Sequence, residues 1–196
     1  MKQEICEFTT DKLLINKYFR LRRAVYNLRD DVPELVNLTD KFDESSDFIV
    51  LRKTDGSVIS GVRLTMSTNH NVLPMEDDGK INLRENFKYI PFEKISYGEV
   101  GKIIICPDYL ECHRSCLAKL FDKIKQRALI YDCHLLFAKV TLPAARLYKK
   151  IGNDVGIIID YDESSLFDYN FSGKPVKKTI ASIYRSVHHK KIILNK

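Results

Sequence analysis

The stretch "GEVGKIIICP", residues 98–107, decides the predicted fold. Its run of isoleucines is typical of a buried β-strand, and Pro107 ends that strand because proline cannot donate a ladder hydrogen bond. The next segment, residues 114–132, has the apolar spacing of an amphipathic helix. Its apolar positions are Leu117, Leu120, Phe121, Ile124 and Ala128. A buried strand followed by a long helix predicts an α/β protein.

Toward the C-terminus the alternation of strands and helices continues. Residues 134–140, "HLLFAKV", are typical of a short buried strand. Residues 142–152, "LPAARLYKKIG", predict a helix that ends with Gly152 in the position after the last helical residue. Residues 155–161 and 176–185 supply two further strands.

Toward the N-terminus, residues 4–8 indicate a first strand. Residues 9–28 indicate a helix, because threonine and aspartate stand at its start as good N-cap residues and apolar side chains then recur at helical spacing. The dipeptide Asp55-Gly56 predicts a β-hairpin within residues 47–66.

Residues 67–96 predict a long excursion with one helical turn, and connections of that length are usually functional or mobile. The order is then strand, helix, loop, three strands, helix, strand, helix and two strands. This order predicts one α/β domain, residues 1–196, in which a mixed sheet carries helices on its faces.

The composition is that of a globular protein, with 44% apolar and 30% charged residues among 196. No apolar run approaches the roughly 18 residues of a membrane-spanning helix. The opening "MKQEICEFTT" has no apolar signal-peptide core. Five cysteines at irregular spacing fit a reducing compartment. We therefore expect a cytoplasmic protein without stable membrane insertion.

A net charge of +6 favours an acidic partner, which could be nucleic acid, an anionic membrane face or an acidic carrier protein. Basic side chains gather on the two later helices, where they form either the solvated faces or a docking surface. Aromatic residues are not interleaved with them, so nucleic acid is not the expected partner. These basic residues are Lys119, Lys123, Lys125, Arg127, Arg146, Lys149 and Lys150.

Two aspartates, Asp40 and Asp43, precede a predicted strand in "TDKFD". They can be turn formers, which aspartate often is. They can also hold a guanidinium, and Arg63 in the apolar strand "VISGVRLTM" needs a negative partner if its face is buried. Arg22 lies on one helical face with Tyr26 and could join the cluster.

Glu99 opens the strand "EVGKIIIC". It is either a strand-end carboxylate in water or a general base that takes a proton from an amine nucleophile, directly or through water. Lys102 is three residues further on, so a regular strand would point it to the opposite face, and a bulge would change that.

A metal site is not predicted. The segment "CPDYLECHRSC", residues 106–116, has no CxxC pair, and buried free thiols explain its cysteines better than zinc does. Glycine-rich nucleotide motifs and the Gly-x-Ser-x-Gly pattern are absent from the sequence. The run His188 to Lys191 is expected to be a solvated tail or a contact to an anionic surface.

Taken together, these motifs resemble the branch of the GCN5-related N-acyltransferase superfamily that contains N-acyl amino acid synthases and acyl-homoserine lactone synthases. The resemblance runs from about Tyr18 to Gly156. The matching residues are Arg22 with Tyr26, Asp40 with Asp43, Arg63 in "GVRL", and Glu99 in "EVGK", where Lys102 replaces an arginine.

The resemblance implies a splayed central sheet and transfer of an acyl group from a phosphopantetheine thioester to an amine. It implies Glu99 as the general base and a backbone amide among Ile103, Ile104 and Ile105 beside the thioester oxygen. Tyr148 in "PAARLYKKIG" would be the general acid for the leaving thiol, or else a plain core tyrosine. No metal or redox cofactor is implied.

Two departures from the family's pattern narrow the expected donor and acceptor. The stretch "ECHRSCLAK" has no glycine-rich turn for a coenzyme A pyrophosphate, which favours delivery of the arm by acyl carrier protein. The chain has no tryptophan, which lactone synthases usually keep in an early loop. We therefore expect a synthase of N-acyl amino acids, such as long-chain N-acyl tyrosine. The alternatives are a lactone synthase that uses S-adenosylmethionine, and a non-catalytic module that binds an acyl carrier or an anionic surface.

Overall fold

The computed structural model describes residues 3–27, 39–68, 72–77, 79, 81–163, 166–171 and 174–185. The strands are β1 (Glu4–Thr9), β2 (Asp47–Lys53), β3 (Val58–Met66), β4 (Ser96–Ile105), β5 (Cys133–Thr141), β6 (Ile157–Asp160), β7 (Phe167–Phe171) and β8 (Lys174–Arg185). The helices are α1 (Lys12–Asn27), α2 (Leu83–Asn86), α3 (His113–Ile130) and α4 (Leu142–Asp154), with 3-10 turns η1 (Asp43–Ser45) and η2 (Pro107–Cys112). The predicted run of elements is confirmed, and β7 is the strand that it lacked.

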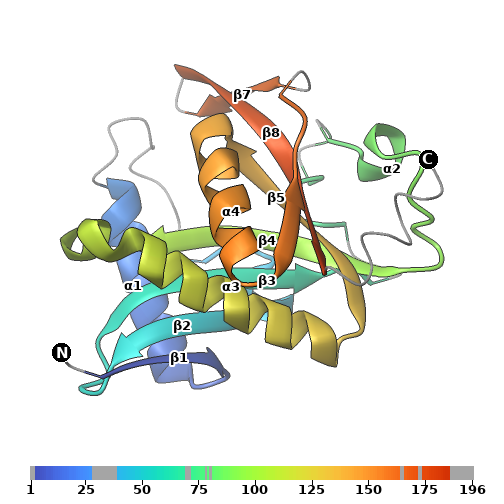
Figure 1. Ribbon diagram of the computed structural model, residues 1–196. Coiled ribbons are helices and arrows are strands. Elements are labelled where there is room, and N and C mark those ends of the chain that lie inside the picture. Colours follow the sequence, from blue (N-terminus) through green and yellow to red (C-terminus); the bar gives the residue numbers. More distant parts are fainter. Residues whose placement is uncertain are drawn as a thin grey trace.

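The strands form one mixed sheet that divides in the middle. Its order is β1-β2-β3-β4-β5-β8-β6, and β7 pairs with β8. Among the strand pairs of the described residues only β4–β5 is parallel, and its register ends where Glu99 meets Phe137. Beyond that point β4 continues with β3 while β5 continues with β8. In Figure 1, β1 to β4 run across the view and β5 and β8 cross them steeply. The predicted α/β fold with a splayed sheet is confirmed.

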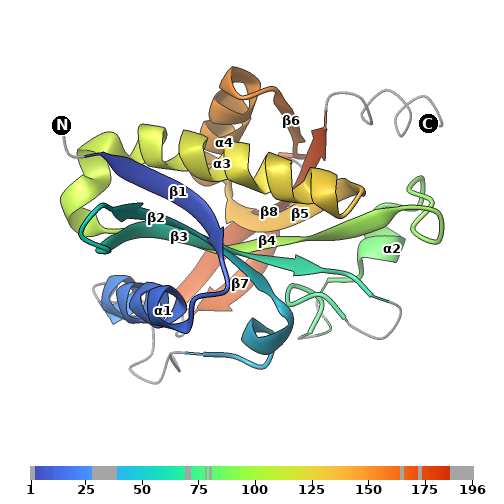
Figure 2. The same cartoon turned by 90° about the horizontal axis from the view of Figure 1, so that it is seen from below.

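Helices cover both faces of the sheet. Figure 2 shows α1 on one side and α3 and α4 on the other. Because side chains alternate along a strand, Val62 and Leu64 of β3 join the core under α3, whereas Arg63 and Thr65 between them face the opposite side. On that side Tyr18 of α1 packs with Phe48 of β2. The face that carries Arg63 is therefore the α1 face.

The long excursion between β3 and β4 is packed on the sheet. It contains the one predicted helical turn, α2, which Asn82 caps through its side chain. Leu73 and Met75 are fully buried, in a cluster with Phe137 of β5 and Ile180 of β8. This cluster fixes the described part of the excursion beside the end of the β4–β5 pairing.

Gly152 does not end α4, and that expectation was wrong. The helix continues to Asp154, and the left-handed residue after it is Gly156, with φ of 71°. Gly152 lies inside the helix at a place with no room for a side chain. A Cβ there would stand 2.9 Å from Ile159 Cδ1 and 3.0 Å from the carbonyl oxygen of Ile157. The missing side chain lets α4 approach β6 closely.

We therefore expect Gly152→Ala to destabilise the protein by about 1–3 kcal/mol, because the added methyl group overpacks the α4–β6 contact. The overpacking outweighs the gain of roughly 1 kcal/mol in helix propensity. Urea unfolding followed by circular dichroism measures the change. Lys150→Ala, at an exposed position of the same helix, is the control and should stay within about 0.5 kcal/mol. Equal stability of the two variants would contradict the close approach.

All five cysteines are free. Cys116 and Cys133 are buried and Cys6 and Cys106 half-buried, but Cys112 is exposed. The expectation of buried thiols is wrong for Cys112 because that residue ends η2, none of whose residues is buried.

No group of metal-ligating side chains occurs among the described residues. None of the helices in the described ranges is long and apolar enough to cross a membrane. The run His188 to Lys191 lies outside the described residues.

Candidate active site

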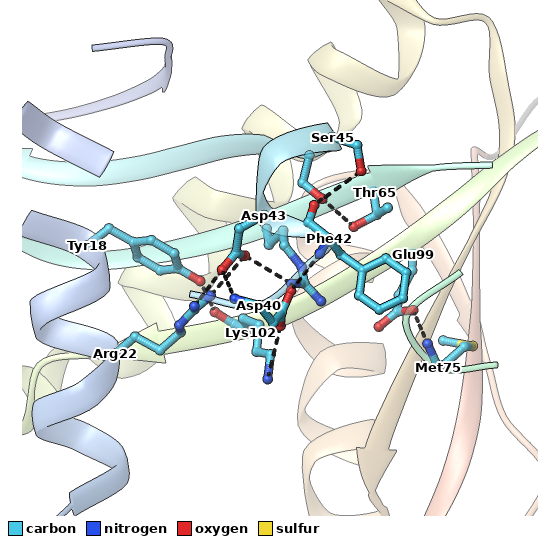
Figure 3. Close-up of polar contacts among 12 residues, drawn as sticks. Tyr18, Arg22, Asp40, Phe42, Asp43, Ser45, Thr65, Met75, Glu99 and Lys102 are labelled. Carbon is cyan, nitrogen blue, oxygen red and sulfur yellow. Dashed lines mark hydrogen bonds and ion pairs between the residues drawn. The ribbon is translucent and has the colours of Figure 1, made fainter. Parts of the chain in front are cut away.

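Four charged side chains meet on the α1 face as an ion-pair cluster of Arg22, Asp40, Asp43 and Arg63. Arg22 of α1 donates two hydrogen bonds to the Asp43 carboxylate, at 3.1 and 2.7 Å. Arg63 of β3 donates to Asp43 Oδ1 at 2.9 Å and to Asp40 Oδ1 at 2.5 Å. Figure 3 shows Asp43 between Arg22 and Asp40. The predicted meeting of the aspartates with both arginines is confirmed.

The centre of the cluster is removed from water. Arg22 is 2% exposed and Arg63 is 1% exposed, whereas about a third of the Asp40 side chain is exposed. Burial by itself would raise the pKa of Asp43, but hydrogen bonds from Arg22, the Asp40 amide and Arg63 outweigh it and lower that pKa. Asp43 therefore stays ionised at neutral pH and neutralises charge that the buried arginines bring in.

The same aspartates also form a turn, so in "TDKFD" they are both turn formers and partners of a guanidinium. The Asp43 amide donates to the carbonyl oxygen of Asp40 at 3.0 Å, and the Phe42 amide donates to the Asp40 carboxylate at 3.0 Å. Phe42 also lies 5.9 Å from the Arg63 guanidinium. The turn ties residues 39–43 to the arginine of the sheet.

A bulge in β4 turns Lys102 toward this cluster. The β3–β4 register shifts between Gly61 and Arg63, and Lys102 has a positive φ of 54°. Its carbonyl oxygen accepts a hydrogen bond of 2.6 Å from the Tyr18 hydroxyl. Its amine lies 3.8 Å from Asp40 Oδ2. The strand is therefore not regular here, and of the two alternatives for Lys102 the structure has the bulge.

Glu99 lies inside β4, which begins at Ser96, so its predicted place at the start of the strand was wrong. Its side chain is buried, with a residue exposure of 6%, and its carboxylate accepts a 2.7 Å hydrogen bond from the Met75 amide (Figure 3). Gly101 leaves the space that this side chain occupies, since a Cβ there would stand 3.0 Å from Glu99 Oε1.

The environment of Glu99 raises the pKa of its carboxyl group. Burial raises the pKa of the carboxyl, and the Met75 hydrogen bond and the charges of Arg63, Lys139 and Lys102 only partly offset that rise. Burial lowers the pKa of Lys102, although Asp40 opposes this. A carboxyl with a raised pKa is suited to accept a proton near neutral pH.

Two cavities with lining residues in common lie beside β4, and the larger of them is lined by Glu99. A cavity of about 270 Å³, here called the strand cleft, opens where β4 and β5 part; Ile103, Ile104, Ile105, Ala144 and Tyr148 are among its lining residues. A cavity of about 770 Å³, the polar chamber, lies over Glu99 and the ion-pair cluster. The residues that line both cavities are Tyr26, Val100, Gly101, Lys102, Lys139 and Lys178. A ligand bound in one cavity can therefore react with a ligand in the other.

Tyr148 has both features that the sequence left open. Its ring packs edge-on against Phe121 of α3, with 5.2 Å between the ring centroids. It also lines the strand cleft, and burial raises the pKa of its hydroxyl to about 12. Tyr148 is therefore a core contact whose hydroxyl stays protonated at neutral pH.

The basic residues of α3 and α4 have ionic partners at different ends of the sheet. Lys119 of α3 pairs with Glu4 of β1 at 2.5 Å, whereas Lys149 of α4 pairs with Asp160 of β6 at 3.6 Å. β1 and β6 are the two ends of the sheet order. Of the other predicted docking residues, Lys123 donates a hydrogen bond to Gln126, Arg146 pairs with Glu163, and Lys150 is exposed.

The turn before α3 offers no glycine-rich anion cradle. Residues 107–112 form η2, which leads directly into α3. The Tyr109 amide donates to the carbonyl of Cys106, and the His113 amide to that of Leu110. These amides are therefore already engaged by the chain.

Three contributors to the site were not predicted from the sequence: the Met75 amide, Lys139 and Lys178. The amide carries no sequence signal. Lys139 could have been found, since alternation in "HLLFAKV" puts it on one face with Phe137. Lys178 follows from the same rule only once the β5–β8 register is known.

Comparisons with known proteins place this geometry in context. No protein-family model and no curated protein sequence matches the chain. Among solved structures, the N-acyl amino acid synthase FeeM from uncultured soil microbes matches with a TM-score of 0.70 at 11% identity, over 100% of this chain and 98% of that one. The CoA-dependent acyl-homoserine lactone synthase BjaI, with MTA, matches with a TM-score of 0.63 at 12% identity, over 97% and 90%.

The lactone synthase LasI matches with a TM-score of 0.58 at 15% identity, over 98% of this chain and 95% of that one. All three likenesses cover nearly whole chains, at identities of 11–15% that show the fold alone. The chain therefore has the GCN5-related N-acyltransferase fold, as do an N-acyl amino acid synthase and two acyl-homoserine lactone synthases.

Proposed function

We propose that the chain is an N-acyltransferase that moves a long-chain fatty acyl group from acyl carrier protein to the α-amine of an amino acid. The observation that carries the proposal is the position of Glu99. This buried carboxylate, with its raised pKa, lines a charged chamber that shares lining residues with the cleft between the parted strands. The fold's occurrence in acyl-transferring proteins supports the same reaction class.

In the proposed reaction the neutral amine attacks the thioester carbonyl carbon. The new C–N bond forms as the amine proton passes to Glu99, directly or through water. The C–S bond then breaks, and the leaving sulfur takes a proton from the Tyr148 hydroxyl or from water. Backbone amides among Ile103, Ile104 and Ile105 would stabilise the oxyanion, because β4 has no β5 partner there. The ion-pair cluster would hold residues 39–43 beside the acceptor.

Carrier protein is the proposed donor because the engaged amides of η2 offer little to a pyrophosphate. The net charge of +6 suits an acidic carrier. Arg146, Lys149 and Lys150 are the favoured docking residues, because their helix α4 also lines the strand cleft through Ala144 and Tyr148. Lys119 and Lys123 lie toward β1 and would contribute less.

A donor panel tests the proposal. The protein is incubated with dodecanoyl and hexadecanoyl thioesters of acyl carrier protein, or of coenzyme A, together with a mixture of amino acids including tyrosine. Products are identified by mass spectrometry. We expect N-acyl amino acids from the carrier thioesters. Coenzyme A as the better donor would contradict the donor assignment, lactone from S-adenosylmethionine would favour the lactone synthase, and carrier binding without any product would favour the binding module.

The role of Tyr148 is tested by Tyr148→Phe, which keeps the ring on Phe121 and removes the hydroxyl. If the hydroxyl protonates the leaving thiol, we expect kcat to fall about tenfold or more while KM for the acyl donor stays near the wild-type value. Steady-state kinetics at several pH values measures this. An unchanged kcat would mean that Tyr148 contributes only its packing against Phe121.

A further inference from the structure

We propose that Lys139 of β5 and Lys178 of β8 bind the carboxylate of the acceptor, so that the acceptor is an α-amino acid and not a simple amine. This inference rests on the proposed acyl transfer and names the residues that would recognise the acceptor's carboxylate. The two lysines would hold the carboxylate by charge-assisted hydrogen bonds while the acceptor amine faces Glu99.

The strand registers put the three side chains on one face of the sheet. Glu99 is paired with Phe137, and alternation puts Phe137, Lys139 and Thr141 on the same side of β5. Thr141 is paired directly with Lys178. Lys139 and Lys178 are thus diagonal neighbours on adjacent strands, just beyond the point where β4 leaves β5.

Both lysines line the strand cleft and the polar chamber, where acyl donor and acceptor must meet. Each is half-buried. A charge interacts more strongly with an anion at the rim of a cavity than on an open surface, because less water screens it there. The charge of Lys139 also reaches Glu99, whose pKa it lowers. The lysine site and the general base are therefore close together.

The chamber carries an excess of positive charge. Six basic and three acidic side chains line it among the described residues, and the excess remains positive when the neighbouring Asp43 is included. An anionic group is attracted into such a site. A sulfonium cation, as in S-adenosylmethionine, is disfavoured there by like-charge repulsion. The basic residues are Arg22, Lys41, Arg63, Lys102, Lys139 and Lys178, and the acidic ones are Asp40, Asp77 and Glu99.

The phosphate of the donor's phosphopantetheine arm is the other anion that could reach these lysines. It is separated from the thioester sulfur by the whole pantetheine chain, whereas an α-carboxylate is two bonds from the reacting nitrogen. Since the thioester carbon must lie near Glu99, a group bound beside Glu99 is the acceptor carboxylate. The phosphate belongs at the far end of the strand cleft.

The kinetic test compares an amino acid with its amide, for example tyrosine and tyrosinamide, in wild type, Lys139→Gln and Lys178→Gln. We expect wild type to prefer the acid by about tenfold or more in kcat/KM. Each variant should lose most of that preference through a higher KM for the acid, with KM for the acyl carrier unchanged. Lys88→Gln, at an exposed lysine outside both cavities and outside the proposed docking residues, should behave as wild type.

A binding measurement separates this inference from the proposed function, because it needs no turnover. Isothermal titration compares N-dodecanoylglycine with N-dodecanoylglycinamide on wild type and on both variants. Tighter binding of the acid by wild type alone supports the lysine site even if no acceptor is turned over. Equal binding of acid and amide by folded wild type overturns the inference, as does a variant effect confined to KM for the carrier.

Discussion

Replacing Glu99 by glutamine is expected to lower kcat for amide formation by about 10²- to 10⁴-fold, the usual contribution of a general base. Glutamine keeps the shape of the side chain and an oxygen that can accept the Met75 amide hydrogen bond, which is 2.7 Å long in the native protein. It cannot take a proton from the attacking amine. The KM for each substrate should change little, since Glu99 acts on the reacting proton and not on binding.

Stability measurements distinguish this loss from unfolding. The folded-state pKa of Glu99 is raised above its ordinary value of 4.5, so folding binds a proton, and wild type loses stability as pH rises from that value through the raised pKa. Glu99→Gln removes this dependence and should be at least as stable as wild type at pH 7 to 8. Glu93→Gln, at an exposed carboxylate, is the matched control for activity. Full activity of a folded Glu99→Gln would contradict the role of the base.

Replacing Asp43 by alanine should have the largest effect on stability, a loss of about 3–5 kcal/mol. Asp43 receives hydrogen bonds from both Arg22 and Arg63, and each guanidinium is almost completely buried. Removing the carboxylate leaves two buried guanidinium groups without the partner that they share. Chemical denaturation, with the midpoint and slope measured together, gives the free energy of unfolding.

The loss should depend on pH in a defined direction. The folded-state pKa of Asp43 lies below its ordinary value of 3.8, so its contribution is present above that value and is lost as pH falls below it. Wild type and Asp43→Ala should therefore approach each other in stability in acid. Glu163→Ala removes a pair with Arg146 that is more than half exposed and should cost at most about 1 kcal/mol. Similar losses in both variants would contradict the view that burial makes the Asp43 cluster different.

The ion-pair cluster could be predicted from the sequence because burial leaves few choices. Arg63 stands in an apolar strand whose neighbours Val62 and Leu64 are core residues, and such a charge requires a carboxylate. The order of strands and helices followed from period and turn residues in the same way, as for Asp55-Gly56 between β2 and β3.

What the sequence could not supply depends on contacts between distant segments. The burial of Glu99 comes from Met75, which an aperiodic excursion brings over β4. Lys102 points toward the ion-pair cluster because of a bulge in β4, and the residues around the bulge carry no sequence signal for it. Gly152 allows α4 to pack closely against β6. The sequence predicts it as the residue after the helix end because a glycine near a predicted helix end fits both roles.

The central claim is that acyl transfer from the thioester needs a free amine beside Glu99. The most direct test measures thiol released from dodecanoyl acyl carrier protein together with amide formed, in the presence and absence of an amino acid. The account predicts thiol and amide in equal amounts, both dependent on the amino acid. Thiol release that ignores the amino acid, or no release from the thioesters of either carrier protein or coenzyme A, would contradict it.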